Sequence, residues 1–184
     1  MTERLLPQND LRPPASAPGA TRPPAEGWVD DRAFSWYADG VISGAFGASV
    51  VALFFLVVDL LAGRPLFTPN ALGTSLFLGQ AAATDAPIVP AIVAGYTAVH
   101  GTIFVGFGVI AAFEVLSLRR IPPTDAGTLL LTALLFVAFE VSFLSMAALF
   151  APHLMAVLGL GRVAIANAIA ALAMARYLLT RLRA

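Results

Sequence analysis

The chain has 184 residues, of which 59% are hydrophobic and only 12% are charged, and it contains no cysteine. A soluble domain normally carries about a quarter charged residues, so this composition excludes an ordinary soluble protein and predicts an integral membrane protein. The 11 basic and 11 acidic residues cancel to a formal net charge of zero, which gives no electrostatic basis for binding nucleic acid. The lack of cysteine excludes disulfides, iron–sulfur clusters and cysteine-ligated zinc.

The first 33 residues differ in composition from the rest, because they hold six of the 13 prolines. Proline lacks an amide donor and Pro-Pro pairs favour extended chain, so no packed core is expected there. No apolar stretch follows the first residue at the distance typical of a cleavable signal peptide. We therefore predict a disordered, Pro-rich cytoplasmic tail over 1–33 and a single four-helix transmembrane domain over 34–184.

Four apolar runs follow the tail, each long enough to cross roughly 30 Å of hydrocarbon at about 1.5 Å per residue. They predict an all-α bundle with membrane spans at about 40–62, 91–118, 127–150 and 157–180. Thr124 or Asp125 is expected to cap the third span. The start of the fourth is left open, because Gly159, Gly161 and Arg162 also suit an interfacial turn.

The distribution of arginine predicts how the bundle is oriented. Four spans put both termini on one face, and that face carries nine of the 11 basic residues. The opposite face carries only Arg64 and Arg162. Because basic residues are retained on the cytoplasmic side, we expect a multi-pass protein of the cell inner (plasma) membrane with both termini in the cytoplasm.

The outer loop, residues 63–90, contains a helix-start signal. Thr68 followed by Pro69 is typical of an N-cap and a first helical residue, and Leu72 and Leu76 would then share a face. This pattern predicts a short interfacial helix on the outer membrane surface. The segment is either a lid or docking surface over the outer mouth of the bundle, or an apolar segment that rests on lipid or on the bundle. A re-entrant hairpin is a third interpretation.

Ionisable side chains inside hydrocarbon are costly, so each needs a physical reason. His100 and Glu140 lie nine and ten residues from the outer ends of the second and third spans, which places them roughly 13.5 and 15 Å deep. The short connection between these spans predicts antiparallel neighbours. We therefore expect an intramembrane polar cluster in which Glu140 accepts a hydrogen bond from His100, with Asn167 at a similar depth. Asp59 lies near the outer end of the first span, where it pairs locally with Arg64, faces water at the outer interface, or forms the outer end of a relay.

Three interpretations of this cluster compete. It is a latch that specifies helix packing and register, a proton or ion relay, or a metal or haem site. A metal or haem requires more ligands than one histidine and one carboxylate, and the other histidine, His153, falls at the outer boundary. We predict no catalytic, cofactor-binding or metal-binding residues and no cofactor.

Small residues are placed for close helix packing, which gives membrane helices their van der Waals contact. Gly40, Gly44 and Ala48 follow at four-residue spacing in the first span, and the fourth span is rich in alanine. The second span contains four glycines, which have no side chain and leave room for a neighbouring helix: Gly95, Gly101, Gly106 and Gly108. The third span carries large aromatic side chains that are expected to face lipid or another subunit: Phe136, Phe139, Phe143 and Phe150.

The sequence contains no phosphate-binding loop, zinc-protease motif or nucleophile elbow. It therefore favours a structural or accessory subunit, or a homo-oligomer, that acts through helix packing. The expected partners are the lipid bilayer and other membrane subunits or a second copy, and no nucleic acid. The alternative is a small proton- or ion-coupled transporter or channel that uses a mid-membrane His100–Glu140 pair. A membrane oxidoreductase ranks third.

Overall fold

The computed structural model describes residues 31–80, 87–117, 124–150 and 158–182. In these residues all regular structure is helical: α1 (Asp31–Leu61), α2 (Phe67–Leu78), α3 (Pro90–Ser117), α4 (Asp125–Phe150) and α6 (Leu160–Leu182). Four stretches are long and apolar enough to cross a membrane: Ser35–Leu61, Pro90–Ser117, Asp125–Leu149 and Leu160–Leu182. Within the described residues, the prediction of an all-α fold with four long apolar helices is confirmed. Residues 1–30 of the predicted tail and His153 lie outside the described residues.

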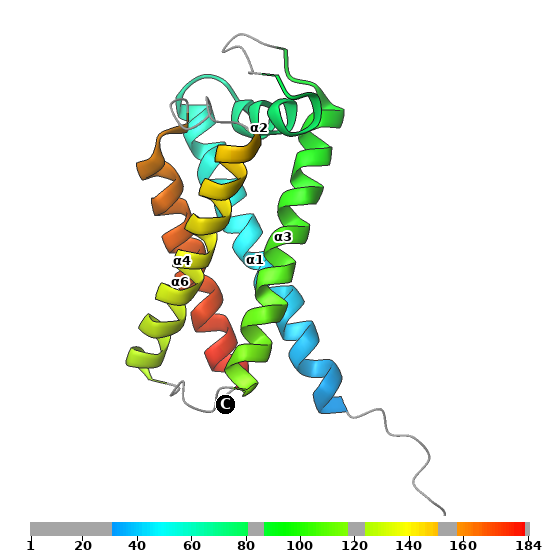
Figure 1. Ribbon diagram of the computed structural model, residues 1–184. Helices are drawn as coiled ribbons and strands as arrows, with labels where there is room; N and C mark the ends of the chain where they lie inside the picture. Colours follow the sequence, from blue (N-terminus) through cyan, green and yellow to red (C-terminus); the bar gives the residue numbers. More distant parts are fainter. Residues whose placement is uncertain (1–30, 81–86, 118–123, 151–157, 183–184) are drawn as a thin grey trace, which may run out of the picture.

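The four long helices run side by side, and the short helix α2 lies across one end of them (Figure 1). The first residues of α1 and the last residues of α6 lie at the opposite end (Figure 1). Helix α3 packs mainly against α1, α4 packs mainly against α6, and α6 also packs against α1. The second and third spans are expected to be antiparallel neighbours, but α3 and α4 meet through side chains such as Phe104 and Phe139 while their backbones stay apart, because each helix has another main partner.

Glycine explains why α3 is drawn to α1. A Cβ atom on Gly44 would collide with the carbonyl oxygen of Phe104, and one on Gly108 would collide with the carbonyl oxygen of Gly40. Only residues without a side chain permit this backbone contact. The predicted small-residue packing is confirmed here, whereas Gly101 and Gly106 have open space around them.

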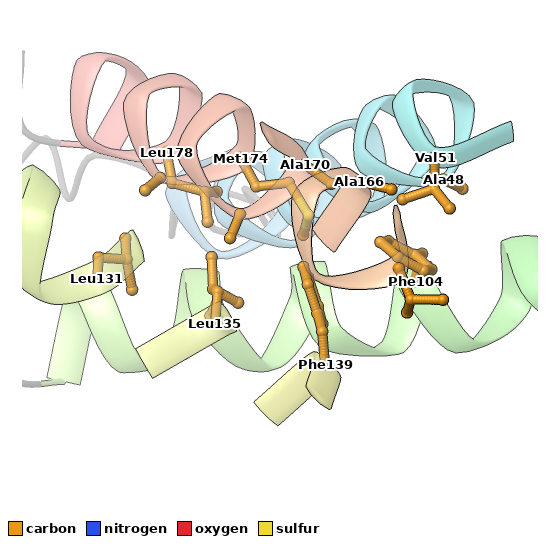
Figure 2. Packing of buried hydrophobic residues seen from close by; sticks show 14 of the residues in the cluster. Ala48, Val51, Phe104, Leu131, Leu135, Phe139, Ala166, Ala170, Met174 and Leu178 are labelled. Carbon is orange, nitrogen blue, oxygen red and sulfur yellow. The ribbon is translucent and has the colours of Figure 1, made fainter. Parts of the chain in front are cut away.

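Helix α6 is the most enclosed span, with 50% of its apolar window buried compared with 17% for α4. Its buried residues recur every three or four positions, so one stripe of the helix faces its neighbours. Figure 2 shows Leu131, Leu135 and Phe139 of α4 directed at this stripe, which includes Met174 and Leu178.

Three of the four phenylalanines named in the third span also differ from expectation, and the side chain of Phe150 lies outside what the structure describes. Phe139 is buried, and Phe136 and Phe143 are half-buried against the core. The expectation that these rings face lipid or another subunit is therefore wrong, since α4 directs them inward to fill the space beside the alanine-rich α6.

The helix ends follow local signals. Helix α1 closes with Gly63 in the left-handed conformation, while the amides of Gly63 and Arg64 donate to the carbonyls of Leu60 and Asp59. Thr124 caps α4, as predicted, because its hydroxyl accepts from the amide of Gly127.

The last span starts at Leu160 rather than near 157. Gly159 precedes it with a φ of 74°, and the carbonyl oxygen of Gly159 accepts the amides of Arg162 and Val163. Of the two interpretations left open, the helical one therefore holds for Gly161 and Arg162, and Gly159 forms the turn before them.

Candidate functional site

Asp59 connects the end of α1 to the start of α2. One of its carboxylate oxygens accepts the backbone amide of Thr68 at 2.7 Å, and the other accepts the Thr68 hydroxyl at 2.7 Å. Asp59 is buried, and it satisfies an amide that a helix leaves free in its first turn. The predicted helix therefore forms, but Thr68 is not its N-cap, because the capping carboxylate comes from another helix.

Asp59 makes no ion pair with Arg64, contrary to the local pairing considered from the sequence. The guanidinium of Arg64 instead lies 4.1 Å from the centre of the Phe67 ring. Leu66, the residue before α2, has a φ of 64°, which is unusual for a residue other than glycine. The turn between α1 and α2 is thus held tightly enough to keep one residue in an unfavourable conformation.

Helix α2 rests on α3 and on the segment before it. The side chain of Asn70 accepts the amide of Val89 at 2.9 Å and donates to the carbonyl of Pro87 at 3.3 Å. Gly73 packs against Ile92 of α3. Apart from Phe67, the buried residues of α2 are small or polar, whereas the expected apolar residues Leu72 and Leu76 are half-buried. Whether the exposed side of α2 lies at a membrane surface stays a prediction.

His100 lies in α3 between two aromatic rings. Its ring stacks on Tyr96 with centroids 5.9 Å apart and contacts Phe104 at 4.7 Å. Its Nε2 atom lies 3.4 Å from the carbonyl oxygen of Ala48 in α1, to which it donates when Nε2 carries the proton. The imidazole therefore has its partner on α1.

Glu140 of α4 has its partner on α6. Its Oε1 atom accepts a hydrogen bond from the side-chain amide of Asn167 at 2.9 Å. The structure thus brings together two members of the predicted cluster and separates them from the other two.

The expected hydrogen bond between His100 and Glu140 is not formed. The reason lies in helix register: Phe104 and Phe107 of α3 contact Phe139 of α4 at 4.8 and 5.2 Å between ring centroids. His100 precedes Phe104 by one helical turn, so it lies nearer to α2 than Glu140 does. Counting depth from the two span ends places the residues at one level only if the helices are equally long and upright.

Asp39 of α1 is a polar residue that the sequence analysis did not select. It is buried, and its Oδ1 atom accepts from the Tyr177 hydroxyl at 3.1 Å and from Arg181 Nε at 3.3 Å, both on α6. The available signal was an acid directly before the first apolar run, together with Tyr177 and Arg181 near the end of the last apolar run. This cluster joins α1 to α6 at the end of the bundle opposite α2 (Figure 1).

A cavity of about 680 Å³ lies between the separated helices α3 and α4. Its walls come from α1, α3, α4 and α6, while Thr68, Pro69 and Leu72 of α2 and the preceding Leu66 also line it. The surface is mostly apolar, with Asp59, His100 and Asn167 among the lining residues. Three of the four residues of the predicted polar cluster therefore border one space without contacting one another.

The described residues form four long apolar helices, which are compatible with an integral membrane protein, and an end helix held by buried polar side chains. No protein-family model, curated protein or solved structure matches the chain.

Proposed function

We propose that this chain is a structural or accessory subunit of a larger membrane assembly, or the protomer of a homo-oligomer, and that it acts through helix packing. The observation that carries the proposal is how its buried polar side chains are used. Asp39, Asp59 and Asn167 each bond a different neighbouring helix and do not converge on one point. Hydrogen bonds in membranes contribute about 0.6 kcal/mol on average, so their main effect is to specify which helices pack and in which register.

The exposed side of α4 supports contact with a partner. Leu130, Leu134, Val137 and Leu144 are exposed and recur at helical spacing, so they form one stripe along the helix. We call these four residues the α4 stripe. Because α4 is the span least covered by its own chain, the α4 stripe offers the most area to another transmembrane helix.

The alternative is a small proton- or ion-coupled transporter or channel. Such a protein needs groups that exchange a proton or ion along a path. We rank this function second, because His100 and Glu140 each bond a separate helix and no hydrogen bond joins them.

The first experiment measures the mass of the protein after extraction in mild detergent. The proposal expects a multiple of the 19.2 kDa chain or a complex with a co-purifying membrane protein. A stable monomer with no co-purifying protein contradicts the proposal.

The second experiment uses the absence of cysteine from the chain. Val137→Cys places one thiol on the α4 stripe, and Val57→Cys places one on the exposed side of α1 as the control. A homo-oligomer formed through the α4 stripe gives a disulfide-linked dimer with Val137→Cys and little with Val57→Cys. Equal cross-linking at both positions indicates random collision and contradicts an interface on the α4 stripe.

A further inference from the structure

The cavity between α3 and α4 is closed at both ends along the direction of the helices. Residues of α2 line one end, where this helix lies across the bundle (Figure 1). The other end is bounded by the rings of Phe104, Phe107 and Phe139, and Phe139 contacts the other two. Most wall residues therefore lie in the half of the spans nearest α2, and Phe104 and Phe107 lie just past the middle of α3.

Five polar side chains in the wall have partners inside the protein, and the hydroxyls of Tyr96, Ser142 and Ser145 line it as well. Asp59 accepts two hydrogen bonds from Thr68, Asn167 donates to Glu140, and His100 Nε2 lies beside the Ala48 carbonyl. The Thr97 hydroxyl donates to the carbonyl of Val93 in its own helix. Little polar surface is left for water, and an apolar cavity does not hold ordered water well.

The closed ends decide what kind of molecule fits. A transmembrane helix of a partner protein runs the full thickness of the bilayer and is about 10 Å wide, so α2 and the phenylalanine rings block its path. A flexible chain enters from the side, between α3 and α4, where their backbones do not pack together. The volume of about 680 Å³ falls within the range of roughly 300–1,000 Å³ typical of sites for small molecules.

We propose that this cavity binds an acyl chain of a membrane lipid, which enters sideways between α3 and α4 and ends against the phenylalanine rings. The bilayer supplies this chain at high concentration, and burying it removes apolar wall surface from any contact with water. None of the four residues of the α4 stripe lines this cavity, and the proposed site does not depend on the proposed oligomer.

The test uses a phosphatidylcholine with a photoreactive diazirine in the middle of one acyl chain, in vesicles that contain the full-length protein. After illumination, mass spectrometry locates the labelled residues. We expect labels on the buried wall residues Val51, Phe104 and Val163, in addition to lipid-facing residues such as Leu60 and Ile110. Labels confined to the lipid-facing residues overturn the proposal.

Two pairs of variants distinguish the cavity from general lipid contact. Ser145→Phe on α4 and Thr97→Phe on α3 fill the cavity from opposite walls. Ala148→Phe and Thr102→Phe are matched controls, because these residues are exposed on the same helices and do not line the cavity. We expect at least a several-fold loss of wall labelling in the two filling variants, no loss in the controls and unchanged labelling of Leu60 and Ile110.

Unchanged labelling of Leu60 and Ile110 also shows that a filling variant has folded. Because the two filling substitutions lie on different helices, misfolding of one variant leaves the other as a test. Wall labelling that persists in both filling variants overturns the proposal.

Whether water fills the cavity is tested with Thr97→Cys, which carries the only thiol in that variant. Rapid reaction of this thiol with a small water-soluble thiosulfonate, at the rate of an exposed cysteine, also overturns the proposal.

Discussion

At the scale of single residues, the buried polar side chains act as connections between segments. Asp39 joins α1 to α6, Asp59 joins α1 to α2, and Asn167 joins α6 to α4. Asn70 ties α2 to the residues before α3. Each of these four groups has its partner within the chain, which reduces the cost of placing a polar group away from water.

Replacing Asp59 by alanine tests the capping of α2. The amide of Thr68 loses its acceptor, and loss of a helix cap costs about 0.5–2 kcal/mol. We expect faster hydrogen exchange at the amides of residues 67–71 and a lower unfolding free energy. Asp59→Asn keeps one acceptor oxygen and should lose less.

Ser49→Ala is the control for a polar change on the same helix, because the Ser49 hydroxyl is exposed and bonds only its own helix at Ala45. It should leave exchange in α2 unchanged. Exchange in α2 that is the same in Asp59→Ala as in the wild type would show that the carboxylate does not cap this helix.

Two substitutions of Glu140 separate packing from proton transfer. Glu140→Gln keeps an oxygen that accepts from Asn167, so we expect little change in stability. Glu140→Leu removes that acceptor and should cost about 0.6 kcal/mol, and at most about 1.7 kcal/mol. Reversible unfolding in detergent micelles measures both.

The same Glu140→Gln variant addresses the alternative function. In reconstituted vesicles, a proton-coupled transporter loses its pH-dependent flux when this carboxylate becomes an amide. We expect no such flux to depend on Glu140, and its loss in Glu140→Gln would favour the transporter.

At the scale of helices, the pairing is decided by where backbones approach closely. Helices α1 and α3 meet through glycine, and α4 meets α6 through large side chains that pack on alanine. The arrangement leaves α3 and α4 apart, and this separation creates the cavity. A short connection along the chain therefore does not make two helices the closest neighbours in space.

Alanine at Gly44 or Gly108 tests the α1–α3 contact. Either Cβ meets backbone atoms of the other helix, so the helices must separate and buried contacts are lost. We expect a destabilisation of about 1–3 kcal/mol, as for overpacked cores. Unfolding in detergent micelles measures it.

Gly106→Ala is the matched control on α3, because nothing lies within 4 Å of a Cβ built there. Alanine favours a helix over glycine by about 1 kcal/mol, so this variant should be neutral or slightly stabilised. Equal destabilisation at Gly106 and Gly108 would contradict a specific contact between α1 and α3.

At the scale of the whole molecule, the described bundle has two different ends. One end carries α2 and the buried Asp59, and the other carries Asp39 with Arg181 and Tyr177 (Figure 1). The distribution of arginine in the sequence predicts that the second end faces the cytoplasm.

Single cysteines test this orientation without background, because the chain has none of its own. Gln80→Cys lies at the α2 end and Ser117→Cys at the opposite end, and both residues are exposed. In intact cells, a membrane-impermeant maleimide should label Gln80→Cys, while Ser117→Cys should react only after permeabilisation. The reverse pattern would place the termini outside.

Local sequence determined the spans of this protein, since a run of about 20 apolar residues has few alternatives to a membrane helix whatever its neighbours are. It also determined the glycine faces of α1 and α3, the cap at Thr124 and the existence of α2. The tertiary structure decided which polar groups meet. Asp59 accepts the amide of Thr68, nine residues ahead, and so caps α2, while His100 and Glu140 bond different helices. Partner choice depends on the rotation, tilt and register of whole helices, and these follow from contacts between distant segments such as Gly44 with Phe104.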